Sequence, residues 1–299
     1  MGDSAGKKFL DKIGAAFFNH CYARTKKLSF DQIERRAKIY SDIYCRLDKK
    51  RVNFAACNMK AAFGGEYTDC EIGKMIKEVV FNFIVEFYMF FNLGNKPREE
   101  VLKMVEFEGK ENLDKAMAEN NGVIFLTAHF GNWEMLARRL CAENLKISVI
   151  ARDSDHVGIT DITNDIRNSG GYSVYSKDRP LLGIIKALRR KECVGILPDQ
   201  SNEDGIWVDF FGRPAKTAAG PAIFSLKTGA PIVPVFCVRE AMGKYKLTAY
   251  PKISFEKTDN YDEDVKNLTQ KCNDVIEAEI RKYPTSWLWI HNRWKSYSK

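Results

Sequence analysis

Short β-branched runs alternate with helical segments from Asn112 onward, and this alternation limits the possible folds most strongly. The runs predict strands at Val123–Ala128, Ile147–Ala151, Val194–Leu197, Pro231–Val238 and Tyr245–Ile253. Helices are predicted near Trp133–Ala142, Val157–Asn168, Leu181–Arg190, Thr217–Lys227 and Asp262–Lys282. Regular alternation of this kind predicts an α/β fold, with a mixed sheet covered by helices on both faces.

The pattern of the first hundred residues predicts helices without intervening strands. A capping-box pattern at Ser29 to Gln32 starts one helix, and further helices are predicted at Val52–Phe63 and Ile72–Leu93. The last of these is apolar almost all round, apart from a narrow stripe at Glu78, Asn82 and Glu86. Such a helix lies in a core or at a membrane interface, and we favour the core. No flexible linker is visible, so we predict one domain over 1–299, with a helical part (1–111) and an α/β core (112–299).

Charge and cysteine usage narrow the class of protein. The 47 Lys and Arg residues exceed the 39 Asp and Glu residues, giving a net charge of +8 that suits anionic partners. The eight cysteines form no C-x-x-C pair, so no metal site is expected and a reducing compartment is favoured. The longest apolar stretch, Val79–Leu93, is shorter than the roughly 20 residues that span a bilayer. We therefore predict no transmembrane helix, and no signal peptide at the N-terminus.

The run Val123 to Glu134 carries the clearest chemical signal. A buried-looking strand leads to His129, and the ends of strands in open α/β sheets are where ligands bind. A turn at Gly131 and Asn132 then allows Glu134 to fold back toward the histidine. A carboxylate that orients an imidazole makes a general base able to take a proton from a hydroxyl. We also count Asn132 among the substrate-binding candidates.

Other polar groups sit at places where ligands bind. Asp199 and Gln200 follow a predicted strand. Gly212 and Arg213 precede Thr217, a predicted helix N-cap, and helix N-termini beside cations bind phosphate well. Arg152 and Arg167 are candidates for an anionic group or a developing oxyanion. The aromatic tail holds Trp287, Trp289 and Trp294, which fit a core, a membrane contact or the wall of an acyl-chain site equally well.

Missing signatures exclude several enzyme classes. The chain has no G-x-S-x-G elbow, no Walker A loop, no G-x-G-x-x-G and no H-E-x-x-H. These absences argue against serine hydrolases, P-loop enzymes, dinucleotide enzymes and zincins. No stacking aromatic and basic motif of single-strand binders is present either, so no nucleic-acid partner is expected.

The ordered stretches resemble the bacterial lipid A biosynthesis acyltransferases, the lauroyl/myristoyl transferases of the lysophospholipid acyltransferase superfamily. The resemblance covers most of the chain and rests on the following stretches: Arg51–Phe63, Ala128–Glu134 with its His-x4-Glu pattern, Pro198–Gln200, Phe210–Pro221, Thr228–Phe236 and Trp287–Arg293. It implies a glycerolphosphate-acyltransferase-like fold, with no cofactor beyond the acyl thioester.

That resemblance also implies a reaction. A fatty acyl chain would move from acyl carrier protein or coenzyme A to a hydroxyl of a lipid or glycolipid acceptor, with His129 as general base and Glu134 as its orienting partner. Asp199 and Arg167 would be further active-site or acceptor contacts, and Gly212–Thr217 would take the place of a phosphate-recognition segment. Backbone amides near Gly131, or an arginine, would stabilise the oxyanion.

The acceptor and the location are less constrained. A lipid A precursor of lipopolysaccharide synthesis is the first expectation, and another glycolipid such as a phosphatidylinositol mannoside is the alternative. We expect peripheral attachment to the cytoplasmic face of the inner membrane, through Phe9–Tyr22, Val79–Leu93 or basic patches. A thioesterase or lipid hydrolase, and a non-catalytic lipid-binding protein, stay open as alternatives.

Overall fold

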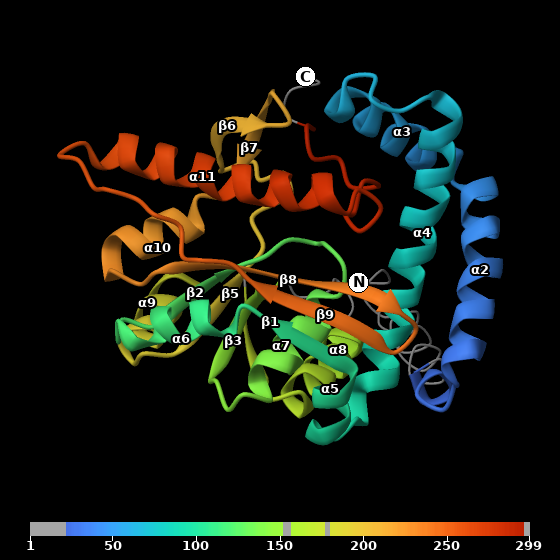
Figure 1. The fold of residues 1–299 in the computed structure, drawn as a ribbon, viewed down its shortest axis with the longest axis horizontal. Helices are drawn as coiled ribbons and strands as arrows, with labels where there is room; N and C mark the ends of the chain where they lie inside the picture. Colours follow the sequence, from blue (N-terminus) through green and yellow to red (C-terminus); the bar gives the residue numbers. More distant parts are fainter. Residues whose placement is uncertain (1–21, 152–156, 177–179, 296–299) are drawn as a thin grey trace, which may run out of the picture.

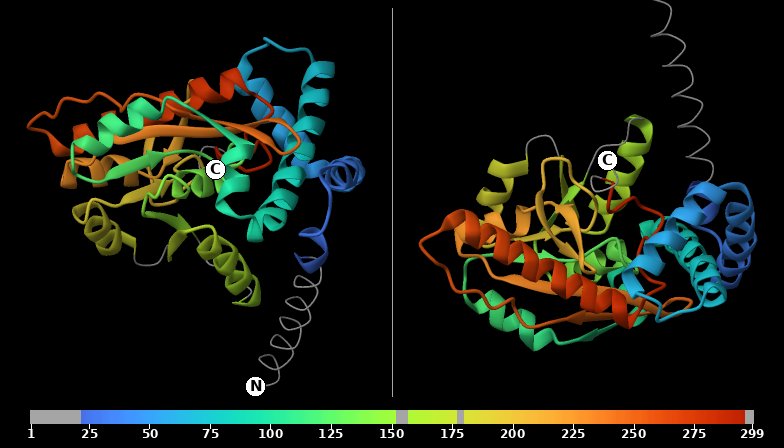
Figure 2. Two further views of the ribbon diagram at one scale, coloured as in Figure 1. Left: turned by 60° about the horizontal axis from the view of Figure 1, so that its bottom comes forward. Right: turned by 90° about the horizontal axis from the view of Figure 1, so that it is seen from above.

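A computed structural model describes residues 22–151, 157–176 and 180–295 (Figure 1). The substrate-binding candidate Arg152 and most of the segment Phe9–Tyr22 lie outside these residues. The N-terminal helical part contains α2 (Phe30–Leu47), α3 (Lys49–Phe63), α4 (Asp69–Asn92), the short 3-10 turn η1 (Leu93–Asn95) and α5 (Arg98–Met104). Helices α2, α3 and α4 stand together at one end of the molecule, whereas α5 lies beside α7 (Figures 1 and 2).

The predicted helix signals of this part are confirmed. The Ser29 hydroxyl accepts a hydrogen bond from the Gln32 amide, and the Gln32 side chain accepts one from the Ser29 amide, which is a complete capping box. Helix α3 ends at Gly64, whose φ of 54° is a left-handed conformation that favours glycine.

Helix α4 packs one face into the core, as predicted, but Asn82 and Glu86 of its polar stripe face inward. Asn82 and Glu86 contact Arg239 of the sheet, whereas Phe83 and Phe87 are exposed at the surface. The reason is that strand β8 presents Arg239, a largely buried arginine, to this helix, and a charge removed from water requires a partner. Periodicity alone could not identify that partner.

The central sheet has seven strands in the order β1-β9-β8-β2-β5-β3-β4. All neighbouring strands are parallel except β8 and β9, so the sheet is mixed, as predicted. The strands are β1 (Val105–Glu108), β2 (Val123–Leu126), β3 (Ile147–Ala151), β4 (Tyr172–Ser176), β5 (Cys193–Ile196), β8 (Ile232–Ala241) and β9 (Lys244–Ala249).

Two of these strands were not predicted. Strand β1 lies before Asn112, inside the part that we expected to be helical, and β4 lies in a stretch without strand assignment. Both are edge strands of four or five residues. Short edge strands need few apolar residues, so their hydrophobic pattern is weak.

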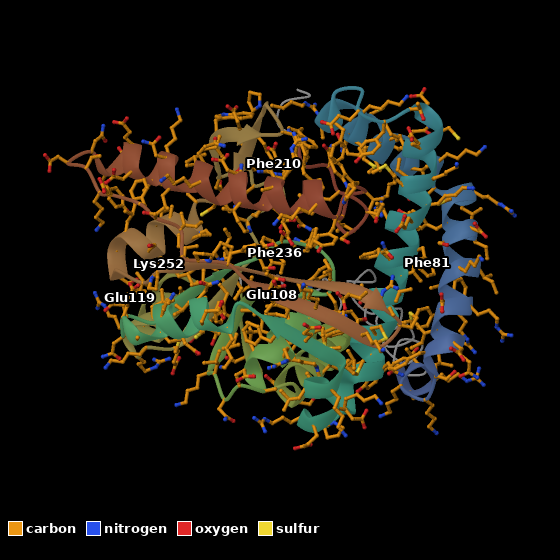
Figure 3. The ribbon with its side chains drawn as sticks, viewed as in Figure 1. Phe81, Glu108, Glu119, Phe210, Phe236 and Lys252 are labelled. Atoms are coloured by element: carbon orange, nitrogen blue, oxygen red, sulfur yellow. The ribbon has the colours of Figure 1, made fainter. Side chains whose placement is uncertain are left out.

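Helices cover both faces of the sheet, as predicted (Figure 2). Alternate residues of β2 enter two separate cores, Ile124 and Leu126 on one face and Val123 and Phe125 on the other. One core includes residues of α9 (Pro180–Arg189), α10 (Gly220–Thr228) and α11 (Tyr261–Lys282), together with Phe210 and Phe236, which Figure 3 marks. The other includes residues of α6 (Lys110–Ala118) and α7 (Trp133–Cys141). Helix α8 (Val157–Ser169) packs beside β4.

A second small sheet replaces the predicted helix start at Thr217. Strands β6 (Ile206–Phe210) and β7 (Arg213–Thr217) form an antiparallel hairpin, and α10 begins only at Gly220 with Ala219 as its N-cap. Thr217 is fully buried and pairs with Ile206 across the hairpin. The assignment of Thr217 as an N-cap was therefore wrong, because strand pairing took precedence over a local capping signal.

None of the helices within residues 22–151, 157–176 and 180–295 combines the length and apolarity needed to cross a bilayer.

Candidate active site

Two neighbouring parallel strands deliver the central pair of side chains. Strands β2 and β5 are paired in register with Leu126 opposite Ile196, and both end at the same edge of the sheet. His129 follows β2 by three residues and Asp199 follows β5 by three residues. Equal spacing after parallel strands brings the two side chains together at the carboxyl edge, where ligands bind in such sheets.

Asp199 holds His129 at two points and is itself held by Trp287. The imidazole Nδ1 lies 2.9 Å from Asp199 Oδ1, and the His129 amide donates to Asp199 Oδ2 at 3.0 Å. The Trp287 indole N–H donates to the same Oδ2 at 2.9 Å. Burial raises the pKa of Asp199, but His129 and the hydrogen bonds of His129 and Trp287 outweigh burial and hold that pKa below its usual value. Asp199 is therefore an ionised acceptor, which places the proton of His129 on Nδ1 and leaves a lone pair on Nε2.

This geometry corrects the predicted orienting partner of His129. Glu134, in the first turn of α7, instead accepts from Arg167 Nη2 at 2.6 Å and from the Tyr172 hydroxyl at 2.5 Å. Burial and the charge of Glu134 raise the pKa of Tyr172 well above its usual value, so the phenol keeps its proton and donates. The predicted site residues Glu134 and Arg167 are thus brought together as an ion pair beside the His129–Asp199 pair.

The turn after His129 explains why Asp199, and not Glu134, contacts the imidazole. Gly131 has a φ of 52°, and a Cβ at this position would lie 2.0 Å from the carbonyl oxygen of Cys237. The Gly131 amide donates to the Ser286 carbonyl, and the Asn132 amide donates to the Cys237 carbonyl, both at 2.8 Å. The turn is therefore pressed against strand β8 and the C-terminal tail, and α7 leaves it in a direction that carries Glu134 toward β4.

Hydrogen bonds within the protein occupy the backbone amides of this turn, where we predicted an oxyanion site. The His129 amide is occupied by Asp199, and the Phe130 amide donates to the Ala128 carbonyl at 2.7 Å. With the amides of Gly131 and Asn132 also occupied, the four amides from His129 to Asn132 all have acceptors within the protein. The other group predicted for the oxyanion, an arginine, has a candidate in Arg167, which lines the larger pocket described below.

Asn132 has a structural role, and it does not line either of the two pockets beside His129 that are described below. Its Oδ1 accepts from the Met135 amide at 2.7 Å, which caps α7, and its Nδ2 donates to Glu86 Oε2 at 2.6 Å. Glu86 also accepts from Arg239 Nε and from the Tyr245 hydroxyl, each at 2.9 Å. Burial raises the pKa of Glu86 above its usual value, although Arg239, Tyr245 and Asn132 act in the opposite direction. Sequence reasoning missed this network, and its one signal was the polar stripe of α4.

We expect Glu86→Gln to destabilise the fold by about 3 kcal/mol, because it leaves the largely buried Arg239 without its ionic partner. Chemical denaturation monitored by circular dichroism measures this change. The matched control is Glu78→Gln on the same helix, since Glu78 is exposed and accepts a hydrogen bond from Thr285. Equal midpoints for the two variants would contradict a structural role of the Glu86 network.

Two pockets meet at His129. The larger has a volume of about 910 Å³, and its polar wall contains His129, Glu134, Arg167, Gln200 and His291. Its apolar wall lies between the sheet and α7 and contains Phe125, Leu136, Ala137, Leu140, Ile147 and Val149. The smaller has a volume of about 40 Å³ and is lined by Glu86, Arg239 and Ser286 among others. His129 and Trp133 line both, with their rings edge to face at 5.2 Å.

The predicted phosphate segment lies elsewhere. Gly212, Arg213 and Thr217 belong to the β6–β7 hairpin and line neither of these two pockets. The Arg213 guanidinium packs over the Trp294 ring at 4.5 Å, and the Thr217 hydroxyl accepts from Arg293. Gln200, by contrast, lines the larger pocket as predicted for a strand-end side chain.

The aromatic tail is core. Trp287, Trp289 and Trp294 are each at most 2% exposed, which decides among the three possibilities left open by the sequence. His291 of the same tail lines the larger pocket, and burial lowers its pKa below the usual value. Within the part of the chain that the structure describes, no group of three His, Cys, Asp or Glu side chains is arranged to hold a metal ion.

Comparison with known proteins identifies the family. The model of the bacterial lipid A biosynthesis acyltransferase family matches residues 13–296 of this chain. The chain belongs to this family. The predicted resemblance is thereby confirmed, and the strand-end histidine with its His-x4-Glu stretch lies inside the matched region.

Characterised relatives act on more than one kind of lipid. The chain is 27% identical over 191 residues to phosphatidylinositol mannoside acyltransferase of Mycobacterium tuberculosis, covering 62% of this chain and 58% of the relative. It is 28% identical over 204 residues to the lipid A biosynthesis palmitoleoyltransferase of Escherichia coli, covering 67% and 64%. The matched part therefore spans about three fifths of the length of these relatives. Among solved structures, the 1-acyl-sn-glycerophosphate acyltransferase PlsC of Thermotoga maritima matches with a TM-score of 0.37 and 14% identity, covering 83% of this chain and 96% of PlsC.

Proposed function

We propose that this protein transfers a fatty acyl chain from a thioester to a hydroxyl of a lipid or glycolipid acceptor, with His129 as general base. The observation that carries this proposal is the buried, ionised Asp199 on Nδ1 of His129, at the rim of a large pocket with an apolar wall. An imidazole held in this tautomer presents Nε2 to a hydroxyl proton.

The proposed reaction is a direct transfer. His129 Nε2 takes the acceptor hydroxyl proton while the acceptor oxygen forms a bond to the thioester carbonyl carbon. Asp199 stabilises the imidazolium that results. The tetrahedral species then collapses, the carbon–sulfur bond breaks, and the thiolate leaves with the electron pair of that bond. A thiol pKa of about 8.5 makes it a good leaving group, and the proton held by His129 neutralises the thiolate.

The walls of the larger pocket suit the two substrates. The apolar wall between the sheet and α7 fits the acyl chain, and Arg167 and Gln200 fit polar groups near the reacting atoms. We propose acyl carrier protein or coenzyme A as the donor carrier. The net charge of +8 supports an acidic carrier or a phosphorylated acceptor.

Ala137→Leu should shorten the preferred acyl chain, because Ala137 lies in the apolar wall and a leucine side chain takes up pocket volume. Each displaced methylene should cost about 0.8 kcal/mol, or roughly fourfold in kcat/KM for the longer donor. Rates with a series of acyl-coenzyme A donors measure this. Leu140→Ala, in the same wall, should shift the preference toward longer chains. An unchanged chain-length profile in both variants would place the acyl chain elsewhere.

We propose peripheral attachment to the cytoplasmic face of the inner membrane. The outer face of α2 exposes Ile39, Ile43 and Leu47, and α4 exposes Phe87. Basic residues of α2 and α3 lie among them in the sequence, and include Arg36, Arg46, Lys49 and Lys50. Apolar side chains beside cations bind anionic lipid surfaces. Co-sedimentation with vesicles, with and without anionic lipid, tests this attachment.

Two experiments test the function. Incubation with an acyl thioester and no acceptor separates a transferase from a thioesterase, since a transferase should release little free fatty acid. Mass spectrometry of lipids from a deletion strain of the source organism should then show one lipid lacking an acyl chain. The names of the relatives support two acceptors, lipid A and a phosphatidylinositol mannoside, so the missing acyl chain should be found in one of these lipids. An unaltered lipid profile together with no turnover would favour a non-catalytic lipid-binding protein.

A further inference from the structure

Acyl transfer through a tetrahedral species requires a hydrogen-bond donor for the oxygen that becomes negative. The four backbone amides from His129 to Asn132 cannot supply one. The amides of His129, Phe130, Gly131 and Asn132 all donate to acceptors within the protein. The donor must therefore come from another group of the same pocket.

Thr127 lies two residues before His129 and on the same side of the chain. Phe125, Thr127 and His129 all line the larger pocket, whereas the intervening Leu126 and Ala128 enter the core on the opposite face of the sheet. The backbone of Thr127 is fixed, because its amide donates to the Ile196 carbonyl of the neighbouring strand β5 at 3.1 Å. This hydrogen bond holds the residue at the rim of the sheet next to the base.

The hydroxyl of Thr127 has no hydrogen-bond partner among the described residues, although the residue is only 3% exposed. Leaving a buried hydroxyl unpaired costs free energy that a valine of the same shape would avoid. The residue fits a site whose partner arrives from outside the chain. Rotation about χ1 exchanges the hydroxyl and the methyl group between staggered positions, so the hydroxyl can turn toward the pocket.

We propose that the Thr127 hydroxyl donates a hydrogen bond to the carbonyl oxygen of the acyl thioester and stabilises the oxyanion formed there. This role rests on the proposed acyl transfer. As the acceptor oxygen bonds to the carbonyl carbon, the π electrons of the carbonyl move onto its oxygen, which accepts the hydrogen bond. Thr127 keeps its proton throughout, and the carbonyl re-forms when the carbon–sulfur bond breaks.

The position of the oxyanion follows from this assignment. Since Thr127 and His129 both line the larger pocket with Phe125, the acyl carbonyl lies between the base and the apolar wall. The acyl chain then continues past Phe125 toward Leu140, on the face of the sheet that α7 covers.

Thr127→Val removes the donor and keeps the shape. We expect kcat to fall by about 100-fold, the usual size for one oxyanion donor, with little change in KM for the donor and in the pH profile. The same variant should be more stable to heat than the wild type, because it removes the unpaired hydroxyl. Thr127→Ser keeps the hydroxyl and should retain most of kcat. Thiol release from palmitoyl-coenzyme A in the presence of lipids extracted from the source organism measures the rates.

Each outcome decides the matter. The proposal is overturned if Thr127→Val keeps the kcat of the wild type. It is also overturned if Thr127→Ser is as slow as Thr127→Val. A lower melting temperature for Thr127→Val overturns it as well, since it would mean that the hydroxyl is already satisfied in the free protein. Full activity of Thr127→Val beside an inactive His129→Ala overturns this inference alone, whereas full activity of His129→Ala overturns the proposed function itself.

Discussion

Replacing His129 with alanine should lower kcat by at least about 100-fold and by up to about 10⁴-fold, the range that general base catalysis usually covers. The imidazole is the group that Asp199 orients at the carboxyl edge of β2, and alanine leaves no proton acceptor in its place. The rate of thiol release with both substrates present is the measurement. Donor binding should survive, because the apolar wall of the larger pocket is untouched.

The histidine of the tail is a matched control for this variant. His291 lines the same pocket, but no hydrogen bond joins its ring to Asp199 among the described contacts. His291→Ala should therefore retain much more activity than His129→Ala. Comparable losses in the two variants, or near-full activity of a folded His129→Ala protein, would remove His129 from the role of base.

Asp199→Asn should lower kcat by about 10²–10⁴-fold while leaving the fold in place, because an amide no longer fixes the proton of His129 on Nδ1. The acyl-transfer assay measures the rate. Glu134→Gln is the informative comparison. The Glu134 carboxylate contacts Arg167 and Tyr172 rather than the imidazole. The variant should therefore lose less kcat than Asp199→Asn, and its main effect should be a higher KM.

A pH series adds a second readout for Asp199. Its pKa is depressed in the folded protein, so the stability it contributes is present above the unfolded value near pH 4 and is lost as pH falls through the folded value. The difference in denaturation midpoint between the wild type and Asp199→Asn should therefore be largest at neutral pH and shrink in acid.

A larger loss of kcat for Glu134→Gln than for Asp199→Asn would restore Glu134 as the orienting residue.

Local patterns predicted those elements whose signal is local. The capping box at Ser29, the left-handed Gly64 and the apolar runs of β2, β3 and β8 need only neighbouring residues to form. The predictions failed where distant partners decided the outcome. Thr217 ends a strand instead of capping a helix because the hairpin partner Ile206 and the tail residue Arg293 hold it.

The same division applies to the site. The sequence by itself determined that a histidine would stand at the end of a buried strand, followed by a turn, because strand periodicity and a Gly-Asn pair are properties of the chain. It also placed Asp199 and Gln200 after a second strand. It did not determine which carboxylate reaches the imidazole, since Glu134 was closer in sequence.

Only the tertiary structure decided that pairing. Strands β2 and β5 are neighbours in register, so Asp199 arrives at His129 although 70 residues separate them. The packing of Gly131 against Cys237 turns α7 away and sends Glu134 to Arg167. The physical reason is that sheet pairing and backbone packing are set by contacts between distant segments, whereas the sequence pattern records only the preferences of each segment.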